Sequence, residues 1–472
     1  MAKTFVGSRV RQLRSERGFS QAALAQMLEI SPSYLNQIEH DVRPLTTAVL
    51  LRITEVFGVD ATFFAPEDDT RLVAELREVT MDRDLDINVD AGEVADMVTA
   101  HPTLARAIVN LHQRYRITTA QLATATEDRF GDGSSGSGAI TMPHEEVRDY
   151  FYQRQNYLHE LDTAAEDLTI QMRMHRGELA SDIAQRLSQV HGVRIIRRTD
   201  LGDTVLHRYD PTTRTLEISN HLSPGQQVFK MAAELGYLEF GALIDQMVDD
   251  GKFTSDESRT LARLGFANYF AAATVLPYRQ FHEVAESFRY DIERLSAFYS
   301  VSYETICHRL STLQRPAVRG VPFSFVRVDK AGNMSKRQSA TGFHFSASGG
   351  TCPLWSVYDT FSNPGKILVQ IAQMPDGRSY MWVARTVARR ASRYGQPGKT
   401  FAIGLGCELR HAHRLVYSEG LDLSGDIATP IGAGCRVCER DNCPQRAFPA
   451  LGRALDIDEH RSTVSPYLVR PA

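Results

Sequence analysis

The sequence predicts a multidomain, mainly α-helical protein with a C-terminal domain of the α+β class. Three features of the chain support this prediction. Apolar residues recur at helical spacing through most of the first 315 positions, strand-like runs with short turns dominate after Pro316, and a Gly/Ser-rich segment at 131–138 interrupts the helical part. A chain of 472 residues is long enough for about three domains.

The pattern of the chain changes at three places and so predicts four regions. Residues 1–67 form short amphipathic helices, and residues 68–142 form further helices that end in the flexible Gly/Ser segment. Residues 143–315 are again helical, apart from one pair of strands in RIIRRT and VLHRYDPTTRTLEI. Residues 316–472 hold several strands, with turns at AGN and PDG.

The composition is that of an ordinary globular protein. Hydrophobic residues make up 43% of the chain and charged residues 23%. No window reaches the about 18 apolar residues that a membrane span requires, so we expect a cytoplasmic protein that does not bind membranes. Because the net charge is only −4, any surface that binds nucleic acid has to be a local one.

The first region contains two short helices joined by a tight turn. Ser20 is placed to cap a helix in SQAALAQMLE. Ser31 is placed to cap a second helix in SPSYLNQIEHD, with Pro32 at the first helical position. Two helices joined in this way form a helix-turn-helix, in which the second helix enters the major groove of DNA. We expect Leu35 and Ile38 of that helix to face the core instead.

The helix-turn-helix geometry predicts which side chains contact DNA. Base edges would be read from the start of the second helix, by Ser33, Tyr34, Asn36 and Gln37, with Ser31 at its cap. Phosphate contacts, which set the register on the duplex, would come from Gln21, Arg43, Arg9 and Arg14. Periodicity alone also allows a helical bundle with a basic surface and no DNA partner.

The segment from Ser20 to Val59 resembles, almost position by position, the helix-turn-helix of the Xre/Cro repressor family. The resemblance implies an N-terminal helix bundle that binds double-stranded operator DNA. Because one such module covers only a short half-site, we expect a homodimer, or a higher homo-oligomer, on an inverted or direct repeat.

Two segments of the third region, FKMAAELGYLEFG at 229–241 and ANYFAAATVLP at 267–277, resemble the ImmA/IrrE metallopeptidase-like domain. That family binds zinc through HExxH, with the glutamate as general base. Here Ala-Glu-Leu-Gly-Tyr stands at 233–237, so Glu234 remains while both histidines are replaced, and Phe266 stands where a further carboxylate is often found. We therefore predict that the chain is not an enzyme and that this region is a scaffold or an effector cleft.

Four of the six cysteines lie in the last seventy or so residues, at Cys407, Cys435, Cys438 and Cys443. Three thiols that are close in sequence can converge on one metal centre, and a fourth completes its ligand set. Cys352 is the reserve ligand. Since Cys443 precedes a proline, as in ferredoxin-type runs, we expect an iron-sulfur cluster of the 4Fe-4S type, while four thiolates would satisfy zinc equally well.

Over the whole chain, HFSASGGTCPLW, GKILVQIAQMPDGR and GAGCRVCERDNCPQRAFP resemble the actinobacterial regulators of short-chain acyl metabolism. The resemblance implies control of acetate, glyoxylate-cycle or propionate genes, an acyl-CoA or related metabolite as effector, and an iron-sulfur cluster in the last domain. Basic residues of that domain could hold a phosphorylated ligand or simply form a solvated surface: Lys336, Arg337, Lys366, Arg378, Arg385, Arg389 and Arg390.

Two other functions stay open at this point. A zinc-stabilised DNA-binding repressor without a small-molecule effector would carry the same first region and the same thiols. An antitoxin-like repressor coupled to a peptidase would also contain the first and third regions, although the replaced HExxH histidines disfavour it.

Overall fold

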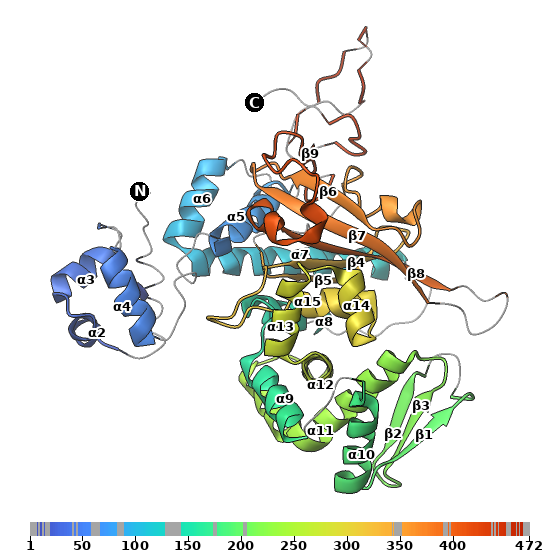
Figure 1. Cartoon of the computed structure of the whole chain (residues 1–472). Coiled ribbons are helices and arrows are strands. Elements are labelled where there is room, and N and C mark those ends of the chain that lie inside the picture. The colour runs from blue at the N-terminus through green and yellow to red at the C-terminus, as the bar shows by residue number, and fades with distance from the viewer. Residues whose placement is uncertain are drawn as a thin grey trace. The chain divides into compact units, whose positions relative to one another are not determined.

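The computed structural model divides the chain into two compact units, residues 1–139 and 140–472 (Figure 1). It describes residues 19–39, 46–57, 67–82, 89–127, 143–172, 177–201, 205–341, 352–389 and 398–435, with isolated residues and short stretches outside these ranges. The predicted Gly/Ser segment at 131–138 lies outside the described residues. Among the helices that are described, none is long and apolar enough to cross a membrane.

The first unit begins with a helix-turn-helix built from α2 (Gln21–Met27) and α3 (Pro32–Glu39), followed by α4 (Thr47–Phe57). The hydroxyl of Ser20 accepts a hydrogen bond from the Ala23 amide, and that of Ser31 accepts one from the Tyr34 amide, both at 3.1 Å. These are the predicted helix caps. Leu35 and Ile38 are buried, which confirms that they face the core.

Three further helices of the first unit share a core of their own. They are α5 (Glu67–Thr80), α6 (Ala91–Ala100) and α7 (Pro102–Glu127). Asp90 and Glu93 form a reciprocal capping box that fixes the start of α6. Buried side chains of all three helices make up this core: Leu72, Leu76, Val79, Val94, Val98, Ala105 and Val109.

The helical part of the second unit packs around two long helices, α11 (Pro224–Asp250) and α12 (Asp256–Val275). They approach closely at Gly236, where an added Cβ would come 2.7 Å from the Phe270 ring. The remaining helices of this part are α8 (Pro143–Gln153), α9 (His159–Gln171), α10 (Leu179–His191), α13 (Tyr278–Ser287), α14 (Ile292–Tyr299) and α15 (Tyr303–Leu310).

The predicted strand pair is present as part of a three-stranded sheet with the order β1-β3-β2. Its strands are β1 (Arg194–Arg198), β2 (His207–Asp210) and β3 (Thr215–Ser219). Strand β3 runs antiparallel to β2, as a hairpin requires, and parallel to β1.

A six-stranded sheet follows, with the order β5-β4-β8-β7-β6-β9. Its strands are β4 (Ser324–Val328), β5 (Met334–Ser339), β6 (Leu368–Gln373), β7 (Ser379–Arg389), β8 (Lys399–Glu408) and β9 (Thr429–Pro430). The pairs are antiparallel except β6 with β9. The predicted turns at AGN and PDG join β4 to β5 and β6 to β7.

The two faces of this sheet belong to different cores because side chains alternate along each strand. Phe325, Leu405 and Cys407 lie on one face and pack with the helices. Val326 and Trp382 lie on the other face, in a smaller core that also contains Trp355 and Cys352. Gly406 leaves room for Trp382, since a Cβ there would come 2.7 Å from the indole.

Candidate functional site

The surface of α3 presents most of the side chains that were predicted to read DNA. Ser31, Ser33 and Asn36 are exposed, while Tyr34 and Gln37 are half-buried. Just beyond the helix, exposed Arg43 places its guanidinium 5.6 Å from the centroid of the Tyr34 ring. This arrangement is compatible with an edge of α3 in the major groove.

Glu39, at the end of α3, is only 2% exposed and holds two of the predicted phosphate-binding side chains. Arg14 donates to its two carboxylate oxygens at 2.6 and 3.1 Å, and Gln21 donates to Oε2 at 2.9 Å. The hydrogen bond that Arg14 donates to Glu39 raises the pKa of Arg14. Arg14 thus ties its own segment to α3, and the structure does not support it as a phosphate ligand. The side chain of Arg9 lies outside the described residues.

Gln21 has a second hydrogen bond, from Nε2 to Oδ1 of Asn36 at 3.1 Å. The same side chain therefore connects the start of α2 to a predicted base-reading residue on α3. Such a contact positions the Asn36 amide before DNA binds. The role of Glu39 as the anchor of this group was missed from the sequence, although its spacing after Leu35 places it on the buried face of the helix.

The positions of the peptidase motif lie inside α11 and face a tightly packed interior. Glu234 is 7% exposed, and its burial raises its pKa to about 7. Phe266 on α12 is fully buried and packs its ring 5.2 Å from that of Tyr150 and 5.7 Å from that of Phe151. An aromatic cluster therefore occupies the place where such peptidases often set a carboxylate.

A cavity of about 1020 Å³ does exist in the second unit, but it lies beside the start of α11 and not at 233–237. Its wall is formed by α8, α11, α12, α15 and the β4–β5 hairpin. Apolar wall residues include Val147, Phe151, Phe229, Leu264 and Ala272. Basic wall residues are Arg148, Lys230, Lys336 and Arg337.

Of the seven basic residues singled out from the sequence, the structure brings Lys336 and Arg337 to the cavity. Arg378 instead pairs with Asp376 at 2.7 Å and Arg385 with Glu293 at 2.9 Å, while Lys366 is exposed elsewhere. The side chains of Arg389 and Arg390 lie outside the described residues. Arg148 and Lys230 were missed, because their helical pattern gives no sign that a cavity separates their helices.

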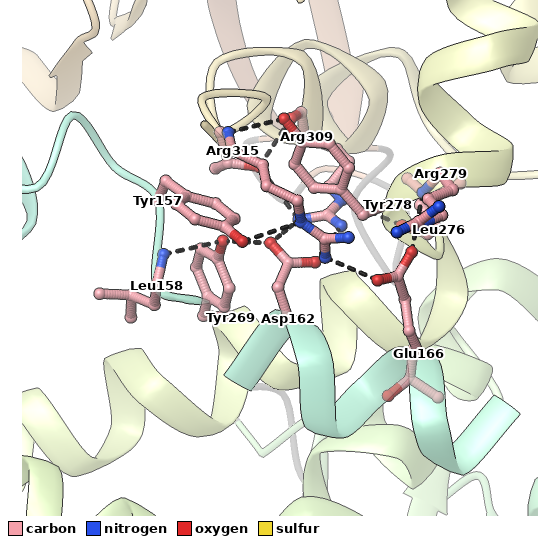
Figure 2. A network of polar contacts seen from close by, with 12 residues as sticks. Tyr157, Leu158, Asp162, Glu166, Tyr269, Leu276, Tyr278, Arg279, Arg309 and Arg315 are labelled. Carbon is pink, nitrogen blue, oxygen red and sulfur yellow. Dashed lines mark hydrogen bonds and ion pairs between the residues drawn. The ribbon is translucent and has the colours of Figure 1, made fainter. Parts of the chain in front are cut away.

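A buried polar network supports the cavity wall at Tyr269 (Figure 2). The Tyr269 hydroxyl donates to Oδ2 of Asp162 at 2.6 Å and accepts a hydrogen bond from the Leu158 amide at 3.1 Å. Asp162 in turn pairs with Arg309 at 2.6 Å, and neither side chain is more than 1% exposed. Beside them, Arg315 pairs with Glu166 at 2.6 Å and donates to the Tyr157 hydroxyl at 2.9 Å. Arg315 lies in the segment that leads from α15 to β4.

The structure does not bring Cys407 together with the other predicted thiol ligands. Cys407 lies on the helical face of β8, fully buried, and this burial raises the pKa of its thiol. Cys352 lies on the opposite side of the sheet, near enough to Cys438 and Cys443 that their negative charges add to burial in raising its pKa. Cys307, in the helical core, is buried.

The loop that carries the remaining thiols is held by backbone and arginine contacts. The Ala447 amide donates to Sγ of Cys435 at 3.2 Å, and buried Arg446 donates to the carbonyl of Cys438 at 3.1 Å. Gly432 admits no side chain, since a Cβ there would come 2.6 Å from Sγ of Cys438. Among the residues that the structure describes, no three His, Cys, Asp or Glu side chains are already placed to hold a metal ion.

Three family models match successive parts of the chain. A helix-turn-helix domain matches residues 7–65, an IrrE N-terminal-like domain matches residues 188–311, and the C-terminal model of the short-chain fatty acyl coenzyme A regulators matches residues 312–467. Together with the geometry of α2 and α3, these matches define the class of protein, a multidomain DNA-binding transcription regulator and not an enzyme.

Relatives over the full length narrow this class. The chain is 85% identical to the HTH-type transcriptional regulator RamB of Mycobacterium tuberculosis over all of both chains, and 47% identical to PrpR of the same species over 99% of this chain and 96% of PrpR. It is 38% identical to the propionyl-CoA carboxylase regulator of Cereibacter sphaeroides over 98% of both chains. The chain belongs to the family of short-chain fatty acyl coenzyme A regulators.

A solved structure supports the fold of most of the chain. The chain resembles a Mycobacterium tuberculosis transcriptional regulator with a TM-score of 0.68 and 51% sequence identity. The alignment covers 70% of this chain and all of that one.

Proposed function

We propose that the chain regulates genes of short-chain acyl metabolism, such as acetate, glyoxylate-cycle or propionate genes, and that an acyl-CoA in the cavity of the second unit sets its affinity for operator DNA. The observation that carries this proposal is the composition of the cavity wall. Aromatic and aliphatic side chains from α8, α11 and α12 line the same cavity as basic groups from α8, α11 and β5, with Glu145 and Glu304 also in the wall. An acyl-CoA has the matching chemistry, an apolar acyl end and a phosphorylated nucleotide end.

The cavity also touches the elements through which a ligand could act on the rest of the unit. Tyr269 in its wall is bonded to the buried Asp162–Arg309 pair, and Ala433 in its wall belongs to the thiol-bearing loop. A ligand shifts the DNA affinity only if it binds two arrangements of the protein differently. We propose that these arrangements belong to a homodimer whose two α3 helices contact the two halves of one operator.

The test measures acyl-CoA binding and its effect on operator binding in the full chain. Acetyl-CoA and propionyl-CoA are titrated by calorimetry, and operator DNA is titrated by fluorescence anisotropy with and without them. A coupling of about 1 to 3 kcal/mol would change the operator affinity roughly five- to 150-fold. The Arg148→Ala variant should weaken acyl-CoA binding about tenfold. Arg259→Ala, which removes an exposed arginine outside the cavity, should not. Identical operator curves with and without bound acyl-CoA contradict the proposal.

We also propose that Cys352, Cys435, Cys438 and Cys443 bind an iron-sulfur cluster of the 4Fe-4S type. The donor chemistry supports this: three of the four thiols are buried, Cys438 and Cys443 lie near enough to Cys352 to act on its thiol, and amide groups of Ala447 and Arg440 donate to two of the sulfurs. Gly432 packs closely against Cys438, as expected of a loop that folds tightly around a metal centre. When bound, such a cluster adds a redox-sensitive cross-link between two segments of the domain.

Anaerobic purification, a visible spectrum, and iron, sulfide and zinc assays test the proposed centre. Cys352→Ser should lower the metal content, while the matched Cys407→Ser should keep it. A colourless protein with one zinc per chain would favour the zinc-stabilised repressor instead. Retained iron in Cys352→Ser together with loss in Cys407→Ser would overturn the proposed ligand set.

A further inference from the structure

Lys336 lines the cavity, and within the described part of the chain its ammonium group has no hydrogen bond or ion pair. It lies on β5 opposite Arg327 of β4, on the face of the sheet that meets the helices. The nearby carboxylate of Glu304 accepts a hydrogen bond from Arg327 at 2.8 Å and is therefore already engaged.

The surroundings of Lys336 disfavour its charged form. Its Nζ lies 5.9 Å from the centroid of the fully buried Phe325 ring, at the outer limit of a cation–π contact that by itself would favour the ammonium form. Burial lowers the pKa of Lys336 to about 8. The negative charge of Glu304 opposes this shift, and the positive charge of Arg327 adds to it. At pH 7 about a tenth of such side chains carry a free amine, which is the nucleophilic form of lysine.

We propose that Lys336 is acylated by the acyl-CoA that this cavity holds. The inference rests on the proposed function, since the thioester has to bind beside β5. The neutral Nζ attacks the thioester carbonyl carbon, so that a C–N bond forms and the C–S bond breaks. The proton that leaves the nitrogen passes to the departing thiolate, and the products are an N-acyl-lysine and free CoA. No oxidant, reductant or third reactant is required.

Acylation would change the cavity in a lasting way. It removes the positive charge beside Arg327 and places a short acyl chain near the buried Phe325 ring. The regulator would then retain a record of acyl-CoA after the nucleotide has dissociated.

The test incubates the full chain with acetyl-CoA, or separately with propionyl-CoA, and follows each lysine by peptide mass spectrometry. Lys330 is the matched control, because it is exposed on the same hairpin and is absent from the cavity wall. At pH 7.5 Lys336 should react roughly tenfold faster than Lys330 or more. Excess free CoA should slow only Lys336, and its rate should level off above about pH 8. K336R should lose this reaction, while K330R should keep it.

Calorimetry on the same samples separates the two possible failures. If acetyl-CoA binds but Lys336 reacts no faster than Lys330, or free CoA does not compete, acylation is refuted and the effector site stands. If neither acyl-CoA nor CoA binds, the effector site itself is refuted, and the acylation inference falls with it.

Discussion

Asp162 and Arg309 are 147 positions apart in the chain and form a two-point ion pair in the interior of the second unit. The pair joins α9 to α15, and Tyr269 of the cavity wall donates to the same carboxylate. The ion pair therefore connects the interior of the helical part to a residue that lines the cavity.

Replacing Asp162 by asparagine should destabilise the second unit strongly, because Arg309 would remain buried without a counter-charge. A loss of about 3 to 5 kcal/mol is expected from such a change. Urea unfolding followed by circular dichroism measures it. The matched control is Asp245→Asn, which removes the partner of Arg263 at an exposed site and should cost less than about 1 kcal/mol. Similar losses in the two variants would show that the buried pair contributes no more to the free energy of unfolding than the exposed pair.

Specific and non-specific DNA binding should respond to different side chains of the first unit. Asn36→Ala or Gln37→Ala should cost about 1 to 3 kcal/mol on the operator and little on random DNA, since base contacts carry the sequence information. Arg43→Ala should weaken both and flatten the salt dependence by about one unit. Anisotropy titrations on the two DNAs decide this. An equal loss for Asn36→Ala on both DNAs would refute its role in reading bases.

The Glu234 carboxyl should make the stability of the second unit depend on pH. Its folded pKa of about 7 exceeds the value of 4.5 expected when it is exposed, so the folded state retains a proton that the unfolded chain releases. Stability from this group is complete below about pH 4.5 and is lost as the pH rises through 7, by up to about 3 kcal/mol. The stability of the Glu234→Gln variant relative to the wild type should therefore increase as the pH rises from 5 to 8. Glu283→Gln, at an exposed position, should show a constant difference across that range.

Gly432→Ala should loosen the thiol-bearing loop, because the new methyl group would come 2.6 Å from Sγ of Cys438. In the metal-free protein, a thiol-modifying reagent should then react faster with Cys438, which is 8% exposed in the native fold. Gly241→Ala provides the control, since its nearest contact would be at 4.0 Å. Unchanged reactivity at Cys438 would mean that the loop can adjust to the extra atom.

The sequence was sufficient for the features that depend on local spacing. The caps at Ser20 and Ser31, the buried Leu35 and Ile38, and the turns before β5 and β7 all follow from residues that are near each other in the chain. The order of the six strands does not, because it depends on pairing between distant segments.

Long-range contacts also explain why the surroundings of individual site residues could not be read from the sequence. Cys407 was grouped with the C-terminal thiols because it is near them in sequence, but strand alternation decides which face of β8 it occupies, and that face packs with helices from earlier in the chain. Arg14 was counted as a surface charge because its partner Glu39 lies 25 positions further on. In both cases the missing information was tertiary.

The pairing of β9 with β6 is confined to Ala372 and Gln373, and Arg440 reinforces it by donating to the carbonyls of Ile431 and Gln373. The thiol-bearing loop begins where β9 ends, so any chemistry that unfolds this loop also uncovers the outer edge of β6. An uncovered strand edge is a template on which another chain can add a strand. Damage to the thiols would then lead to self-association of the regulator, and its removal by aggregation would change the expression of the genes it controls.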